Sequence, residues 1–232
     1  MKHIKSLLLT FVFTFCGILI FGQSDSAGMV KFSPDFKFKE GIYINFDQVK
    51  ENDPVPKSRI LTSIDYDDQY FFDHLQDQKK IYYYDKVGTK HELVVKNLWG
   101  YSRNGFLYIN INGNFFRITY IGKICHFVAT QTTYNNAYSN PYYYNYNYYY
   151  SPYQFNPQNY QTTEMRQYLL DFETGKVFDY NDESVEVLLM KDPALYDEYM
   201  ALRKKKKKQL KFLYIRKFNE QNPLYFPKSS NN

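Results

Sequence analysis

Apolar and polar positions alternate in short runs between about residues 41 and 132, with turn residues between the runs. This pattern is typical of an antiparallel sheet. The clearest part is a hairpin in which residues 106–111 and 114–121 flank Asn112-Gly113, a turn whose two central positions need positive φ. The turn fixes a register with Tyr108 opposite Arg117 on a half-solvated face. The other face is predicted to be core and collects Leu107, Ile109, Ile111, Phe116 and Ile118.

A second tight turn at Gly122-Lys123 leads into a strand over residues 124–132. A two-residue loop there places Tyr120 opposite Cys125 and Ile118 opposite Phe127. Because adjacent strand residues project to opposite faces, Cys125 is predicted to point into the core and His126 to point outward. This alternation favours a structural role for the thiol over a nucleophile-base pair.

The remaining runs predict further strands, whose order the sequence does not determine. A hairpin is expected over residues 167–181, with its turn at 173–176. Other strands are expected at 41–46, 69–73, 80–85 and 91–97. The chain holds 26 Tyr and 20 Phe against one Trp, and aromatic enrichment favours strands.

The apolar period changes from two to about 3.6 after residue 181, which predicts a helical C-terminal part over residues 182–220. Asp182 is expected to cap a short helix, and Asp192 followed by Pro193 to start a longer one. Helices beside an antiparallel sheet give an α+β class. The sheet is expected to be a meander, barrel-like or a sandwich.

A low-complexity insertion over residues 133–163 interrupts the sheet. Residues 134–160 contain 11 Tyr, seven Asn and three Pro, and residues 124–163 contain no Asp, Glu, Lys or Arg. We expect a disordered loop between neighbouring strands. An adhesive surface for glycans or other chains, or a self-associating segment, are the alternatives.

The N-terminus has the pattern of a signal peptide over residues 1–22. Lys2 and Lys5 precede an apolar run over residues 7–21, after which the chain turns polar at Gln23. Removal of the signal takes away Cys16 and the only segment that could span a membrane. We therefore expect export to the periplasm, the cell surface or the extracellular space, a flexible segment over residues 23–39, and one β-rich domain over residues 40–232.

Charge gives two further indications. The chain carries a formal charge of +5, and loss of two lysines with the signal leaves 5 − 2 = +3, too little to indicate a nucleic-acid partner. A local basic run is either a solvated helix face or a patch attracted to anionic lipid head groups. Its members are Arg203, Lys204, Lys205, Lys206, Lys207, Lys208 and Lys211.

Catalytic and metal-binding patterns are weak in this sequence. Carboxylates such as Glu92, Asp171 and Asp179 belong to different predicted strands and would serve a glycoside hydrolase only if the fold brought two of them together. The histidines lack a second His or Cys at ligand spacing. We expect no cofactor and no metal.

Three blocks carry a resemblance to a family. They are Gly41-Ile42-Tyr43-Ile44-Asn45-Phe46, then Leu98-Trp99-Gly100-Tyr101 followed by Phe106-Leu107-Tyr108-Ile109-Asn110, and Asn219-Glu220-Gln221-Asn222-Pro223-Leu224-Tyr225-Phe226-Pro227. Together they resemble an uncharacterised family of exported Bacteroidetes proteins. The resemblance implies export and a single domain, and it carries no activity and no site residues.

The functional hypothesis is a non-enzymatic binding or structural module of the cell envelope, whose partner is a protein, a glycan or an anionic surface. Two alternatives stay open: an envelope hydrolase that uses carboxylates from different strands, and a protein that associates with surfaces through residues 203–211. The half-polar face of the best-defined hairpin, with Tyr108, Arg117 and His126, is the first place where we expect a pocket.

Overall fold

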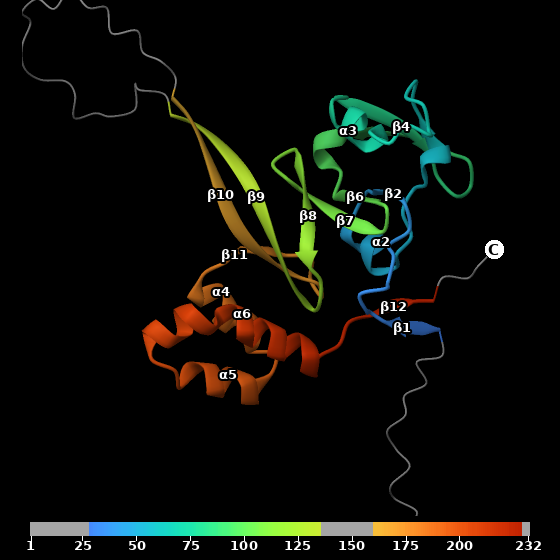
Figure 1. The fold of residues 1–232 in the computed structure, drawn as a ribbon. Coiled ribbons are helices and arrows are strands. Elements are labelled where there is room, and N and C mark those ends of the chain that lie inside the picture. Colours follow the sequence, from blue (N-terminus) through green and yellow to red (C-terminus); the bar gives the residue numbers. More distant parts are fainter. Residues whose placement is uncertain (1–27, 136–159, 229–232) are drawn as a thin grey trace, which may run out of the picture.

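The computed structural model describes residues 28–135 and 160–228, which fold as the predicted α+β class. Its largest element is an antiparallel sheet of seven strands in the order β11-β10-β9-β8-β7-β6-β2 (Figure 1). The strands are β2 (Gly41–Tyr43), β6 (Gly100–Arg103), β7 (Phe106–Ile111), β8 (Asn114–Tyr120), β9 (Ile124–Asn135), β10 (Tyr160–Asp171) and β11 (Val177–Asp179). Because β6 to β11 are neighbours in chain order, the sheet is a meander. It is not closed into a barrel.

The register of the β7-β8 hairpin is confirmed. Tyr108 lies opposite Arg117, and Asn112 and Gly113 take φ angles of 56° and 88°. The next turn departs from the prediction. Ile118 does lie opposite Phe127, but Tyr120 lies opposite His126 rather than Cys125, because a bulge shifts the register between Ile118 and Tyr120.

A three-stranded sheet with a short helix forms a second unit of packing. Its strands are β3 (Ile60–Leu61), β4 (Lys80–Tyr84) and β5 (Lys90–Val94). The strand predicted at 69–73 is wrong, since α3 (Phe71–Gln76) forms there and buries Phe71, Phe72 and Leu75. These apolar residues recur at helical spacing, but the short aromatic run at residues 70–72 also fits the composition of a strand.

Short helical turns also end two predicted strands early. The strand expected at 41–46 stops at Tyr43, because the Asn45 side chain accepts a hydrogen bond from the Gln48 N–H at 3.0 Å and starts α2 (Phe46–Lys50). The strand expected at 91–97 stops at Val94, where η3 (Val95–Asn97) begins. Another such turn is η2 (Lys57–Arg59).

The C-terminal part contains α4 (Asp182–Leu189), α5 (Pro193–Met200) and α6 (Lys204–Gln221). Asp192 caps α5 as predicted, whereas Asn181 rather than Asp182 caps α4. The single long helix expected after Asp192 is therefore wrong. Helix α5 ends at Met200, and the chain reverses direction over residues 201–203 before α6 begins. The ring centroids of Tyr199 and Tyr214 are then 4.9 Å apart.

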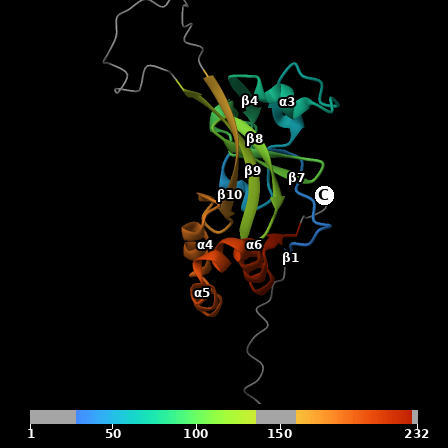
Figure 2. The same cartoon turned by 60° about the vertical axis from the view of Figure 1, so that its left-hand side comes forward.

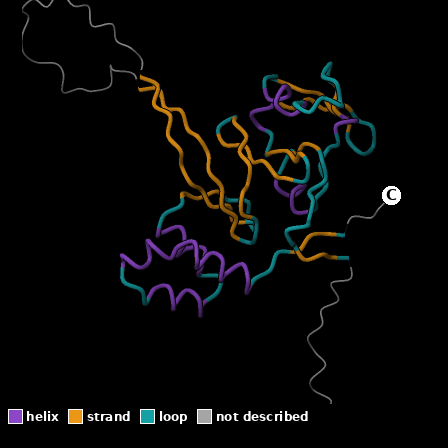
Figure 3. The backbone as a smooth tube through the Cα atoms, in the orientation of Figure 1, coloured by secondary structure: helices purple, strands orange, loops and turns teal. Residues whose placement is uncertain are grey.

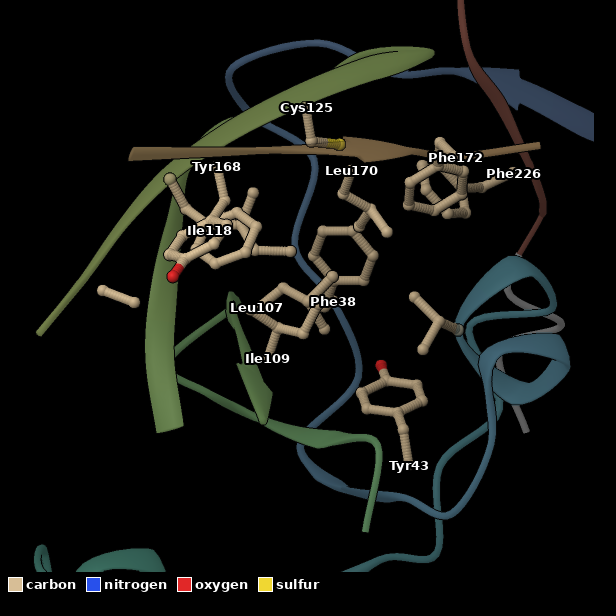
Figure 4. Packing of buried hydrophobic residues seen from close by; sticks show 13 residues of the cluster. Phe38, Tyr43, Leu107, Ile109, Ile118, Cys125, Tyr168, Leu170, Phe172 and Phe226 are labelled. Atoms are coloured by element: carbon tan, nitrogen blue, oxygen red, sulfur yellow. The ribbon is translucent and has the colours of Figure 1, made fainter. Parts of the chain in front are cut away.

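The helices α4, α5 and α6 lie at one end of the large sheet, and α3 lies with β4 at the other end (Figures 1 and 2). Between these two groups lies an apolar core that contains side chains of β7, β8, β9 and β10. In this core Leu107, Ile118 and Leu170 are at most 3% exposed (Figure 4). Cys125 also lies in this core, as predicted, and is fully buried.

Part of the segment expected to be flexible belongs to this core. Strand β1 (Met29–Lys31) pairs with β12 (Tyr225–Pro227), and the Phe38 side chain is only 3% exposed. The expectation for residues 23–39 is thus wrong for residues 29–38. Burial of Phe226 at the other end of the chain explains why, since Phe36 stacks on its ring at 4.6 Å.

Strands β9 and β10 pair over 12 rungs, from Ile124↔Asp171 to Asn135↔Tyr160, and extend beyond their neighbours as a two-stranded projection (Figure 3). Residues 133–135 and 160–163, predicted to belong to the insertion, are strand instead. The rest of the insertion, residues 136–159, lies outside the described residues. So does the predicted signal peptide, residues 1–22.

Among the helices of residues 28–135 and 160–228, none has both the length and the apolar character to cross a bilayer.

Candidate functional site

A groove of about 630 Å³ lies on the described part of the chain. Its volume lies in the range of small-molecule sites. One wall is the segment of residues 31–38, the opposite wall is the β8-β9 turn with the end of α6, and the hairpin β7-β8 lies between them. The apolar lining comes from Phe32, Pro34, Phe36, Phe38, Phe106, Ile118, Tyr120, Ile121 and Pro223. We call this feature the groove.

The α6 wall is fixed to the sheet by one side chain. The Asn219 Oδ1 accepts a hydrogen bond from the Ile124 N–H at 2.9 Å, and its Nδ2 donates to the Ile124 carbonyl at 2.8 Å. A Cβ on Gly122 would lie 2.4 Å from the Asn219 side chain. The glycine therefore leaves the room in which this amide sits beside the turn.

The opposite wall is fixed by backbone hydrogen bonds and by aromatic packing. The Phe32 N–H donates to the Leu224 carbonyl at 2.8 Å, and the Phe38 N–H donates to the Gly105 carbonyl at 3.3 Å. Gly105 has a φ of 78° and lies against the Lys37 stem, which a Cβ would meet at 2.5 Å. The wall is thus held at both ends.

The charged groups of the groove are mainly positive. Lys31, Lys37 and Arg117 contribute to the lining, against one carboxylate, Glu220. The Arg117 guanidinium lies 3.6 Å from the centroid of the Phe106 ring, and the Lys37 ammonium lies 5.4 Å from the same centroid. None of these three cations forms an ion pair with a residue that the structure describes.

The contact with Phe106 leaves the Arg117 guanidinium able to donate hydrogen bonds to a ligand. A cation–π contact at this distance uses the face of the ring and leaves guanidinium N–H donors that can hold a carboxylate or a phosphate. Glu220 does not occupy them, since its own cation is Arg216 at 3.9 Å. The groove thus combines an apolar lining with donors suited to an anion.

The structure does not bring the three residues of the predicted pocket into one site. Arg117 lines the groove. Tyr108 is stacked on Tyr101 at 4.6 Å and belongs to the packing of the three-stranded sheet. The His126 Nε2 lies 2.9 Å from the Gln167 Oε1, and its ring contacts Tyr180 and Phe212 under α6.

Sequence reasoning missed the wall formed by residues 31–38, because this segment was expected to be flexible. A signal was present in the alternation of Phe36 and Phe38 with lysines, which is the pattern of a half-buried extended chain. The C-terminal strand that covers it lies almost 200 residues away in the chain, and no local pattern indicates that pairing.

The basic run divides into two groups. Lys207 lies 2.8 Å from the Glu186 carboxylate and Lys211 lies 3.3 Å from Asp182, so these two lysines face the helices beside them. The other cations of the run are exposed and make no ion pair within the described ranges: Arg203, Lys204, Lys205, Lys206 and Lys208.

The three carboxylates considered for hydrolysis do not all lie in one sheet. Glu92 lies on β5 and pairs with Lys80, whereas Asp171 and Asp179 lie on the large sheet. The Asp171 carboxylate is occupied by the Lys191 ammonium at 2.8 Å and the Thr174 hydroxyl at 2.7 Å. Burial raises the pKa of the Cys125 thiol to about 12, which opposes nucleophilic chemistry there.

No group of three or more His, Cys, Asp or Glu side chains within residues 28–135 and 160–228 is placed to hold a metal ion. Comparisons of the chain with protein-family models, with curated proteins and with solved structures gave no match.

Proposed function

We propose that this protein is an exported binding module whose groove holds an anionic amphiphile, a molecule with an acidic head and an apolar body. The observation that carries the proposal is the presence of Lys31, Lys37 and Arg117 in a mainly apolar groove without ion-pair partners among the described residues. Pockets with an apolar lining and a few convergent polar groups are the usual form of ligand sites. Export rests on the sequence of residues 1–22.

The head group is assigned to Arg117 and Lys37, because both cations lie over the Phe106 ring. The apolar body is assigned to the rings and aliphatic side chains along the segment of residues 31–38 and to Tyr120 and Ile121. A carboxylate and a phosphate are both suited to these donors. The protein would carry or sense such a molecule rather than convert it, since Glu220 is the one carboxylate among the described lining residues and no second acid lies beside it there.

Dodecanoate tests the proposal, because it joins a carboxylate to an unbranched apolar chain. Its binding is measured by isothermal titration calorimetry below its micelle concentration, with dodecyl phosphate as the second anion and dodecyl maltoside as the neutral probe. The test variant is Lys37→Met/Arg117→Met, which removes two charges and keeps the apolar stems. The matched control is Lys205→Met/Lys206→Met, which removes two exposed charges from α6.

We expect the groove variant to weaken dodecanoate and dodecyl phosphate binding at least about tenfold, which corresponds to about 1.4 kcal/mol. The control variant should bind as the unmodified protein does, and the neutral probe should not distinguish the variants. Equal binding by the groove variant would overturn the proposal. Loss of binding in the α6 control alone would instead assign anion binding to the exposed residues of the basic run.

A further inference from the structure

Within the described residues, the outer part of the β9-β10 pair has no neighbouring strand on either edge. Residues 130–135 of β9 pair rung by rung with residues 160–165 of β10, from Thr130↔Met165 to Asn135↔Tyr160. The partners of β9 on β8 extend only to Phe127, and those of β10 on β11 only to Tyr168. We call these two stretches, residues 130–135 and 160–165, the arm. A two-stranded ribbon alone is marginally stable in water, so a further strand would stabilise it.

The two edges of the arm differ in their protection. The β10 side carries Glu164, whose carboxylate lies 3.1 Å from the Arg166 guanidinium, and charged side chains discourage edge pairing. The β9 side reads Thr-Gln-Thr-Thr-Tyr-Asn over residues 130–135 and contains no charge, no Pro and no Gly. The bulge between β8 and β9 lies before this stretch, between Ile118 and Tyr120 of β8. Along residues 130–135, the β9 edge thus has no charge, Pro or bulge that would block strand addition.

We propose that the β9 edge of the arm pairs with the same edge of a second copy, as an antiparallel two-fold contact. An antiparallel strand pair about a two-fold axis is self-complementary, because each copy presents the same stretch to the other. The β9 stretch suits this role because it is uncharged and rich in Thr, a residue that favours strands. A six-residue strand on each side forms a continuous four-stranded sheet with the two arms.

The placement of the arm permits this contact. The arm extends away from α4, α5 and α6 and from the core of the large sheet (Figures 1 and 3). In an antiparallel pairing the two folded bodies therefore lie at opposite ends of the joined sheet. Each copy carries a positive formal charge, which such a separation tolerates.

Sedimentation velocity over a concentration series from about 5 µM to about 500 µM tests the proposal, a range that covers weak to moderate association. Two single lysine substitutions form a matched pair. Thr132 and Thr163 lie opposite each other on one rung, with their hydroxyl oxygens 3.5 Å apart. T132K places the charge on the proposed contact strand, and T163K places the same charge one strand away.

We expect the unmodified protein to form a dimer that T132K weakens at least tenfold and T163K weakens less than threefold. Added salt should recover part of the loss in T132K, because screening reduces the repulsion between the two lysines. Far-ultraviolet circular dichroism checks that both variants keep the fold. A monomer at every concentration, a dimer that T132K leaves intact, or an equal loss in both variants would overturn the proposal.

Discussion

At the end of α6, the Asn219 side chain acts as a short piece of neighbouring strand, because it satisfies both the N–H and the carbonyl of Ile124. These backbone groups lie where β9 begins, just after the turn at Gly122-Lys123. Buried backbone groups without partners are costly. Asn219 therefore couples the position of α6 to the sheet, and with it the α6 wall of the groove.

Removal of this amide should destabilise the whole domain. We expect Asn219→Ala to lower the free energy of unfolding by about 2 kcal/mol, since two hydrogen bonds are lost and each contributes about 1 kcal/mol. Equilibrium unfolding in urea measures the change. The control is Gln221→Ala at the end of the same helix, where the side chain is exposed. A cost below about 0.5 kcal/mol for Asn219→Ala would contradict this role.

Gly122→Ala should act through the same contact. Its Cβ would lie 2.4 Å from the Asn219 side chain, so the amide has to leave its position and both hydrogen bonds to Ile124 are lost. In the double variant with Asn219→Ala this clash is absent. The costs of the two substitutions should therefore not add, and a double-mutant cycle in urea measures the coupling. Simple additivity would show that Gly122 and Asn219 act independently.

At the scale of elements, the Asp171-Lys191 pair joins the end of β10 to the connection between α4 and α5. The Asp171 side chain is 6% exposed and that of Lys191 is 34% exposed. Burial by itself would raise the pKa of the Asp171 carboxyl, but hydrogen bonds from Lys191, Thr174 and the Glu173 N–H bring this pKa below its ordinary value. The pair thus holds the helical unit to the sheet while Asp171 is ionised.

The sign of the pH dependence follows from the lowered pKa. A carboxyl whose folded pKa is depressed stabilises the fold above its unfolded pKa of about 3.9, and this contribution is lost as the pH falls through the folded pKa. We expect Lys191→Met to lower stability at pH 7 by about 1 to 2 kcal/mol, a value reduced for the partial exposure of the lysine. Urea unfolding at pH 7, 5 and 3 measures both effects.

Lys191→Met should also lose less stability than the unmodified protein between about pH 5 and pH 3, because without the lysine the pKa of Asp171 is less depressed. Lys50→Met is the matched control, since its partner Asp47 is 81% exposed at a helix surface. Its pH profile should follow that of the unmodified protein. Parallel profiles for Lys191→Met and the unmodified protein would exclude Asp171 as a source of acid sensitivity.

The elements also show what local patterns can predict. The β7-β8 hairpin was predicted with its register, because Asn112-Gly113 allows one turn geometry and one alternation of faces. The break between α5 and α6 was missed, because lysines at residues 204–208 permit a continuous helix. The fold-back is favoured by contacts between distant side chains, such as those of Tyr214 with Tyr199 and Glu198. Of the residues named for the predicted pocket, only Arg117 lines the groove. The groove itself was not predicted, since its walls join residues far apart in the chain.

At the scale of the whole molecule, the proposed ligand site and the proposed contact between copies are separate. The groove is lined by residues 31–38, the start of β7, the end of β8 and the end of α6, whereas the arm begins at residue 130. Neither region includes residues of the other. Substitutions can therefore test ligand binding and self-association independently, with unfolding in urea as a common check of the fold.

Replacement of residues 136–159 by Asn-Gly tests how the Tyr-rich insertion relates to the rest of the molecule. Asn135 and Tyr160 form the last rung of the β9-β10 ladder, so a two-residue turn can close the hairpin at that point. We expect the thermal midpoint to shift by less than about 4 °C, the change that corresponds to about 1 kcal/mol in a domain of this size. Differential scanning calorimetry measures the shift, and a larger fall would show that the insertion stabilises the fold. Dodecanoate binding and dimer formation should both persist, because the groove and the β9 edge lie within the residues that remain.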